Sequence, residues 1–154
     1  MMNRLRVSVL CLLAAVACLT ASCGGGSDAP TAPSSPSSSQ SVPFTVTDLR
    51  VGTGAEAVAG KVLFVNYTGW LYSATAVDNK GTQFDTSVGR TPLSFRLGAG
   101  SVIPGFDRAF GGMRVGGQRR LIIPPDLAYG SAGAGGVIPP NATLVFDVEL
   151  VDVQ

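Results

Sequence analysis

The fold can be read most directly from residues 102–150, VIPGFDRAFGGMRVGGQRRLIIPPDLAYGSAGAGGVIPPNATLVFDVEL. Aromatic and branched side chains recur there beside Pro and Gly, which mark tight turns between short elements. The whole chain contains no histidine. We therefore expect a cleft with aromatic walls, whose chemistry relies on exclusion of water and on backbone hydrogen bonds rather than on proton transfer.

One helix is predicted within this stretch. Its apolar face follows i, i+3, i+4, i+7 spacing and consists of Phe106, Ala109, Phe110 and Met113. Pro104 suits the first turn of this helix, and the two glycines at 111–112 end it.

Five segments have the alternation, or the β-branched and aromatic content, of strands: residues 44–49, 61–72, 93–97, 120–123 and 143–153. In the last segment, one face carries Leu144, Phe146, Val148 and Leu150, and the other carries Val145, Asp147, Glu149 and Val151. Residues 73–81 are polar or small and indicate a loop or a bulge. One short helix among five strands predicts an α+β fold, in which a curved antiparallel five-stranded sheet wraps over the helix.

Residues 1–22 have the pattern of a lipoprotein signal peptide. Arg4 and Arg6 precede an apolar run that is shorter than the roughly 20 residues needed to span a bilayer. The following LTASC, residues 19–23, resembles the bacterial lipobox, whose cysteine is acylated and becomes the mature N-terminus. We therefore expect a lipid at Cys23. Ordinary cleavage that leaves a spare cysteine is one alternative, and acylation at Cys18 is another.

Residues 23–41 are predicted to form a tether, because Gly, Ser, Pro, Ala and Thr dominate them and cannot bury enough apolar surface to fold. Residues 42–154 are the predicted globular domain. The expected location is the cell envelope, facing the periplasm or at the outer membrane. The membrane is then reached only through the lipid.

The composition of this domain excludes several classes of function. From residue 24 onward, nine of the 11 Lys and Arg residues remain against ten Asp and Glu, with interspersed signs and no basic surface for nucleic acid. All three cysteines precede residue 24, so the domain has neither His nor Cys for a zinc site or a hydrolase triad. We expect no metal and no cofactor.

Four blocks resemble the FKBP-type peptidyl-prolyl cis-trans isomerases in order and spacing: YTGWL at 67–71, QFD at 83–85, LSFRLGAGSVIPGFDRAFGGMRVGGQRRLIIPPDLAYG at 93–130 and GVIPPNATLVFDVEL at 136–150. The resemblance implies a monomeric enzyme that rotates X–Pro bonds in unfolded or exported polypeptides and binds macrolide inhibitors. A non-catalytic chaperone or binding module with this fold is one rival function, and a structural envelope lipoprotein is another. The presence of Tyr67, Asp85 and Tyr129 favours the enzyme.

The same resemblance assigns roles to individual residues. The catalytic set it implies is Tyr67, Phe84, Asp85, Ile103, Tyr129 and Phe146. The further substrate contacts are Leu93, Phe95, Val102, Phe106, Val137 and Ile138, the last two forming the far wall of the pocket. The Ile103 N–H and the Tyr129 hydroxyl are expected to donate to substrate carbonyls, and Asp85 to accept hydrogen bonds at the rim.

Without the resemblance, several of these residues have ordinary structural interpretations. Phe95 and Phe146 would be core residues and Asp85 a turn residue, while Tyr67 and Tyr129 fit either use. Four other acidic residues are interpreted as surface or turn groups: Asp107, Asp126, Asp147 and Glu149.

Three features depart from the family pattern. Phe106 stands where Trp is common at the pocket floor, and the single tryptophan, Trp70, lies in a predicted strand. Ala134 replaces a bulkier polar residue of many relatives, and residues 73–80 look like an insertion. We expect a pocket of altered shape with altered contacts at the edge of the substrate.

Overall fold

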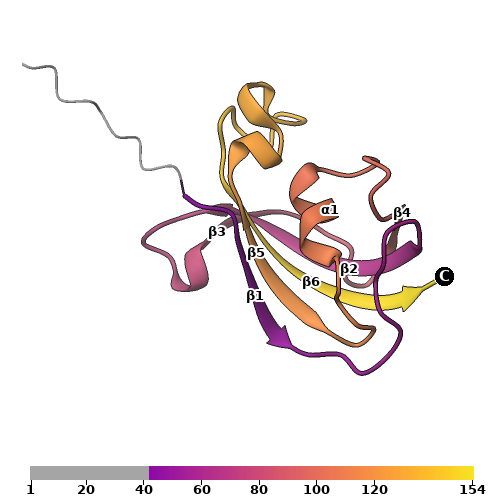
Figure 1. The fold of residues 1–154 in the computed structure, drawn as a ribbon. Coiled ribbons are helices and arrows are strands. Elements are labelled where there is room, and N and C mark those ends of the chain that lie inside the picture. The colour runs from indigo at the N-terminus through magenta and orange to yellow at the C-terminus, as the bar shows by residue number, and fades with distance from the viewer. Residues whose placement is uncertain (1–41) are drawn as a thin grey trace, which may run out of the picture. The chain divides into compact units, whose positions relative to one another are not determined.

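The computed structural model describes residues 42–154. They form an antiparallel sheet with one α-helix against one of its faces (Figure 1). The predicted signal peptide at 1–22, the tether at 23–41 and the predicted acylation site Cys23 lie outside the described residues.

The six strands are β1 (Thr45–Arg50), β2 (Val62–Tyr72), β3 (Lys80–Thr86), β4 (Leu93–Arg96), β5 (Gln118–Ile123) and β6 (Leu144–Val153). The helix is α1 (Pro104–Phe110), and three short 3-10 turns are η1 (Val77–Asn79), η2 (Pro125–Leu127) and η3 (Gly130–Ala132). Within residues 42–154, no helix is long and apolar enough to cross a membrane.

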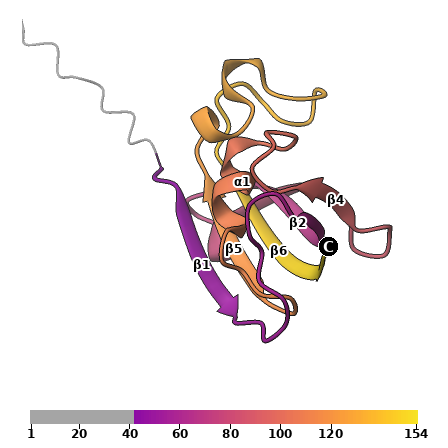
Figure 2. The ribbon, with the colours of Figure 1, turned by 45° about the vertical axis from the view of Figure 1, so that its right-hand side comes forward.

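The strands are ordered β1-β5-β6-β2-β3, and all neighbours are antiparallel. The long strand β2 pairs with β6 on one edge and with two strands on the other, because β4 takes residues 62–65 and β3 takes residues 68–72. Tyr67 lies opposite Val148 on β6, and Gly69 lies opposite Phe146. Figure 2 shows β4 at the margin of the sheet, on the side away from β1.

The sheet has six strands where the alternation predicts five, and the additional strand is β3. Its sequence, KGTQFDT, is mostly polar and contains a glycine, so it lacks the pattern of a buried strand. Because β3 lies at the edge of the sheet and pairs only with β2, backbone hydrogen bonds hold it without full burial of its side chains. The loop predicted over residues 73–81 is shorter than expected, because β3 already begins at Lys80, and η1 lies within this loop.

The helix packs on the inner face of the sheet, as its pattern predicts. All four residues of its predicted apolar face are buried: Phe106, Ala109, Phe110 and Met113. Gly105 permits the close approach of α1 to β5, because a Cβ at this position would lie 2.5 Å from Ile123 Cγ2. The predicted inner face of β6 is also buried throughout. This layer between sheet and helix is the core of the domain.

Val145 is buried as well, although the alternation predicts that it lies on the outer face with exposed neighbours. It is directly opposite Trp70 on β2 and Ile122 on β5. The large side chains of Trp70 and Ile122 flank Val145 on the outer face of the sheet. This face therefore has a small apolar cluster of its own.

Ion pairs hold residues 73–80, the predicted insertion, against this outer face. Asp147 on β6 accepts hydrogen bonds from Lys80 Nζ at 2.6 Å and from Arg120 Nε at 2.7 Å. Arg120 also pairs with Asp78 at 2.9 Å. The segment is thereby joined to two interior strands, β5 and β6.

The carboxylate of Asp147 is the centre of this group. Burial acts to raise its pKa, but the hydrogen bonds from Arg120 and Lys80 outweigh burial, and the pKa is lowered. The Lys80 ammonium also lies 4.4 Å from the centroid of the Trp70 ring, within the range of a cation–π contact. The expectation that Asp147 is an ordinary surface group is therefore wrong. Glu149 does fit that expectation, since it pairs with Arg50 in solvent.

Candidate active site

A pocket opens between the inner face of the sheet and the segment that leads into α1. Its volume is about 270 Å³, and its lining residues are Tyr67, Phe84, Asp85, Leu93, Ser101, Val102, Ile103, Phe106, Tyr129 and Phe146. They come from β2, β3, β4 and β6, from the start of α1 and from the connection after β5. The fold therefore gathers side chains that are far apart in the sequence.

Aromatic rings in edge-to-face contact form the floor of the pocket. The Phe106 ring centroid is 4.9 Å from that of Phe146 and 6.3 Å from that of Tyr67, and Phe84 lies 5.6 Å from Phe146. Gly69 makes room for them, because a Cβ there would lie 2.6 Å from Phe84 Cζ and 2.7 Å from Phe146 Cε1. Phe106 and Phe146 are 4% and 3% exposed, so water has little access to the floor.

A hydrogen-bonded group fixes one side of the rim. The Tyr67 hydroxyl donates to Asp85 Oδ2 at 2.5 Å, while Asp85 Oδ1 accepts from the Arg90 guanidinium at 2.9 Å and from the Thr86 N–H at 2.8 Å. The hydrogen bond from Tyr67 is the main cause of a lowered pKa at Asp85. Burial, followed by the hydrogen bond to Asp85, raises the pKa of Tyr67 to about 12. Both groups therefore keep one protonation state across neutral pH.

Two hydrogen-bond donors at the pocket have no acceptor within residues 42–154. The Ile103 N–H, at the N-cap of α1, donates to no group there, whereas the Ile103 carbonyl accepts from the Phe106 N–H at 2.9 Å. The Tyr129 hydroxyl likewise bonds to none of these residues, and Tyr129 is 40% exposed. A bound molecule with two carbonyl oxygens would satisfy both donors.

The family model for FKBP-type peptidyl-prolyl cis-trans isomerases matches residues 54–151. This chain belongs to that family. Over 109 residues it is 53% identical to an FK506-binding protein of Neisseria meningitidis serogroup A, a match that covers 70% of this chain and 94% of that protein.

Two solved structures are also similar. FkpA from Escherichia coli has a TM-score of 0.60 and 44% identity, over 72% of this chain and 48% of the FkpA chain, so the chain matches about half the length of that protein. A peptidyl-prolyl cis-trans isomerase from Pseudomonas syringae has a TM-score of 0.60 and 40% identity, over 72% of this chain and 75% of that one.

The pocket of this FKBP-type chain brings together most of the residues predicted for it. All six residues of the expected catalytic set line it, as do Leu93, Val102 and Phe106. Phe95 does not. It is buried behind Phe106, with ring centroids 6.5 Å apart, and packs edge-on against Phe110 at 5.5 Å. Phe95 therefore packs behind the floor of the pocket, in the core.

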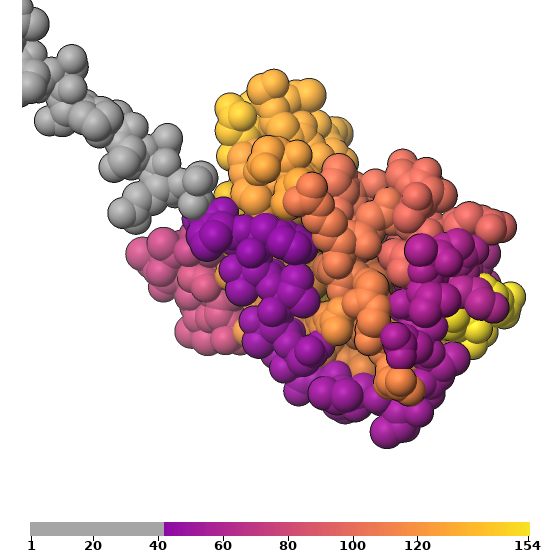
Figure 3. All heavy atoms as spheres, viewed as in Figure 1, coloured from indigo at the N-terminus to yellow at the C-terminus, as the bar shows by residue number. Residues whose placement is uncertain are grey.

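Val137 and Ile138, predicted to form the far wall, are not among the residues that line this pocket. They lie in the connection from β5 to β6, which projects from the rest of the domain in Figure 3. Two backbone hydrogen bonds of 3.0 Å between Ala134 and Ile138 turn the segment back on itself. As a result Ile138 is buried within the projection, and Val137 is 58% exposed outside the pocket.

Sequence reasoning missed two residues of the FKBP-type pocket and its rim. Ser101 contributes to the lining just before Val102, and Arg90 holds the Asp85 carboxylate. Ser101 is small and polar, Arg90 is charged, and both lie in exposed loops. Nothing in the sequence distinguishes such residues from ordinary surface groups.

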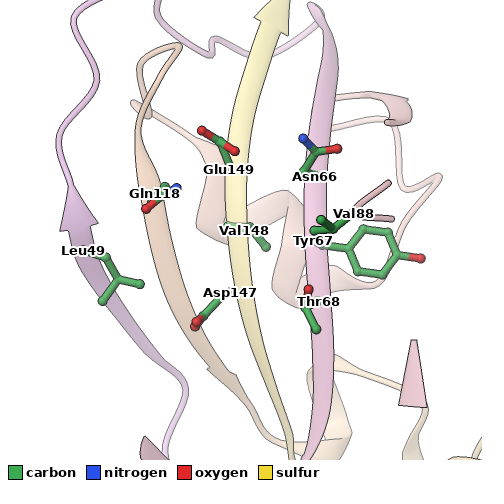
Figure 4. A pocket seen from close by; sticks show the side chains of 9 residues that line it. All are labelled: Leu49, Asn66, Tyr67, Thr68, Val88, Gln118, Asp147, Val148 and Glu149. Carbon is green, nitrogen blue, oxygen red and sulfur yellow. The ribbon is translucent and has the colours of Figure 1, made fainter. Parts of the chain in front are cut away.

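Two other hollows lie near Tyr67. One, of about 190 Å³, is on the outer face of the sheet and is lined by Leu49, Asn66, Tyr67, Thr68, Val88, Gln118, Asp147, Val148 and Glu149 (Figure 4). The other, of about 460 Å³, lies on the side of Arg90 and Pro92. Neither combines an aromatic floor with unused donors, so the aromatic pocket remains the candidate active site.

Proposed function

We propose that this chain catalyses cis–trans isomerisation of X–Pro peptide bonds. The observation that carries the proposal is a water-poor aromatic pocket of about 270 Å³ beside two unused donors, the Ile103 N–H and the Tyr129 hydroxyl. The aromatic floor suits a prolyl ring, and the two donors suit the carbonyl groups on either side of it.

Exclusion of water explains how such a pocket lowers the barrier. Rotation of a peptide bond is slow because amide resonance imposes a barrier of ~18–20 kcal/mol. The planar amide carries partial charges on oxygen and nitrogen, and the twisted transition state carries less. Next to Phe106 and Phe146, water no longer stabilises the planar form, so the twisted form gains relative to it. A rate increase of five powers of ten corresponds to about 7 kcal/mol.

The remaining residues hold the substrate while one bond turns. The Ile103 N–H and the Tyr129 hydroxyl bind carbonyl oxygens and keep the flanking chain in place. The hydrogen bond from Tyr67 to Asp85 fixes the Tyr67 ring at the side of the pocket. No step transfers a proton, which agrees with a chain that contains no histidine.

Macrolides of the FK506 type are proposed as competitors for the same pocket. The 53% identity to a protein named FK506-binding protein supports this assignment. Such a ligand offers carbonyl oxygens to the two donors and an apolar ring to the aromatic floor.

The test uses the purified full chain in detergent and measures cis–trans exchange of Leu-Pro and Phe-Pro peptides by NMR. An exchange rate above background that saturating FK506 abolishes supports the proposal. A chain that binds FK506 without accelerating exchange would be a non-catalytic binding module. Absence of both effects would overturn the assignment of the pocket.

We further propose that the substrates are exported polypeptides of the cell envelope and that the chain is anchored there by a lipid on Cys23. Support comes from the sequence pattern of residues 1–41, which lie outside the described residues. A Cys23→Ser variant is expected to move from the membrane fraction to the soluble fraction and to lose palmitate labelling. Retention of the variant in membranes would contradict the lipid anchor.

A further inference from the structure

The segment between β4 and α1 is closed into a loop by one side chain, Asp107. Its Oδ1 accepts a hydrogen bond from the Gly98 N–H at 3.0 Å, and its Oδ2 accepts one from the Gly100 N–H at 3.1 Å. Asp107 lies in the first turn of α1, so the carboxylate connects the helix to the beginning of the loop. The sequence-based interpretation of Asp107 as a plain surface or turn group does not account for these contacts.

The loop has little else to hold it. Residues 98–101 are all exposed, and no heavy atom outside the adjoining residues would lie within 4 Å of a Cβ at Gly100. Gly98 and Gly100 have φ angles of +79° and +67°, in the left-handed region that favours glycine. Besides the two bonds to Asp107, the Ala99 N–H donates to the Arg96 carbonyl at 3.3 Å, and a Cβ at Gly98 would lie 3.9 Å from Ala59 Cβ. A loop with such flexible residues and little packing is fixed mainly by its hydrogen bonds. Asp107 makes no ion pair with the described residues, so its negative charge is available to the two N–H groups.

The residues that follow the loop face the pocket. Ser101, Val102 and Ile103 line it, and Ile103 supplies the unused N–H. The Asp107 N–H also donates to the Ile103 carbonyl, at 3.4 Å. Asp107 therefore contacts the chain just before the pocket-lining residues through its carboxylate, and contacts the last of them, Ile103, through its backbone N–H.

We propose that Asp107 is a positioning residue, which holds Val102 and the Ile103 N–H at the place where a substrate carbonyl binds. This role rests on the proposed isomerase function of the pocket. Loss of the carboxylate would release residues 98–101, and the Ile103 donor would then sample orientations in which it cannot bind the substrate.

The experiment compares Asp107→Asn, Asp107→Ala and Asp107→Glu with Asp152→Asn as the control, in the full chain. Asp152 is an exposed carboxylate near the end of β6, away from the pocket. All measurements are made at a temperature at which thermal unfolding shows every variant to be folded. A merely structural role for Asp107 would then leave kcat/KM unchanged.

We expect kcat/KM to fall roughly tenfold in Asp107→Ala, somewhat less in Asp107→Asn, and to recover in part in Asp107→Glu. Amide hydrogen exchange at Gly98 and Gly100, which donate to Asp107, should accelerate in the Ala and Asn variants. The Ile103 N–H has no acceptor to lose, so its mobility is followed by ¹⁵N relaxation, and its order parameter should fall in the same variants. Asp152→Asn should match the parent chain in all these measurements. A kcat/KM within twofold of the parent in the folded Ala variant would overturn the proposal.

The amide measurement separates this role from the isomerase function. If the parent chain shows no turnover, the isomerase function fails, and the positioning role is decided by the ¹⁵N order parameter of the Ile103 N–H alone. A lower order parameter there in Asp107→Ala supports it, and an unchanged order parameter overturns it.

Discussion

Tyr67 and Asp85, on the adjacent strands β2 and β3, share a hydrogen bond of 2.5 Å between the phenol and the carboxylate. Burial and then this hydrogen bond raise the pKa of the phenol, and the hydrogen bond lowers that of the carboxyl, so that it links the ionisation of the two groups. It also joins the edge strand β3 to the interior strand β2 at the rim of the pocket.

A Tyr67→Phe variant should release Asp85 while keeping the ring in the pocket. We expect the pKa of Asp85 to rise toward its ordinary value and the free energy of unfolding to fall by about 1 kcal/mol, because a partly exposed hydrogen bond is lost. The measurements are carboxyl ¹³C NMR titration and denaturant unfolding. Tyr72→Phe is the matched control, since the Tyr72 hydroxyl has only a 3.4 Å contact, with Asn79. An unchanged Asp85 titration would mean that the hydrogen bond is absent in solution.

A Tyr129→Phe variant should affect activity without affecting stability. The hydroxyl has no partner within residues 42–154, so its removal leaves nothing unsatisfied in the free protein. If it donates to a substrate carbonyl, kcat/KM should fall by about fivefold, which corresponds to about 1 kcal/mol. Peptide exchange by NMR and thermal unfolding are the two measurements. A variant with full activity would remove Tyr129 from the site.

Activity should not depend on pH between about 5 and 9. The pKa of Asp85 lies below its ordinary value and that of Tyr67 at about 12, so neither group at the rim titrates in this interval. The measurement is NMR exchange, because a coupled protease would impose its own pH dependence. A bell-shaped profile centred near pH 7 would indicate an acid–base group that the pocket does not contain.

Stability should decline at alkaline pH because of Tyr67. Its folded-state pKa, about 12, is above the ordinary value of 10.0. The folded state therefore binds more protons than the unfolded state between these values, so this contribution is complete below pH 10 and is lost as pH rises through 12. Denaturant unfolding of the parent and of Tyr67→Phe between pH 8 and 12 should converge. Parallel curves over that range would contradict the raised pKa.

An Asp147→Asn variant should lose stability and keep its activity. Lys80 and Arg120 would lose their shared partner on the outer face, away from the pocket, at a cost of about 2 kcal/mol. The cost is below that of a fully buried pair, because the Asp147 side chain is 28% exposed. The pKa of Asp147 is lowered, so the parent should lose this stability as pH falls below about 4, whereas the variant should not. Reduced peptide exchange in the folded variant would contradict the separation of the two faces.

Elements with regular periodicity could be predicted from the sequence, and α1 and β6 are examples. Their apolar positions recur at 3.6 and 2 residues because each buries one continuous face. The strand β3 could not be predicted in this way, since an edge strand depends on backbone pairing and requires little apolar surface. The burial of Val145 depends on the neighbours that two other strands place beside it, and local alternation does not contain that information.

The candidate site could be predicted to a similar extent. The aromatic floor came from motifs that fix residue types at definite spacings, and the structure places those residues together. Arg90 and Asp107 escaped prediction because their partners, Asp85 and the N–H groups of Gly98 and Gly100, are determined by the fold of exposed loops. Ile138 lies outside the pocket lining because its segment turns back on Ala134, a long-range feature of the fold that its motif does not contain.

The position of Trp70 decides what optical spectroscopy can detect in this protein. Trp70 is the only tryptophan, and it lies beneath the Lys80 ammonium on the outer face, whereas the pocket floor contains phenylalanine. Its fluorescence emission should therefore change when residues 73–80 detach and when the domain unfolds, but should change little when a ligand binds in the pocket. Ligand titrations need another spectroscopic reporter, whereas the native tryptophan fluorescence reports on the outer face of the sheet independently of ligand binding.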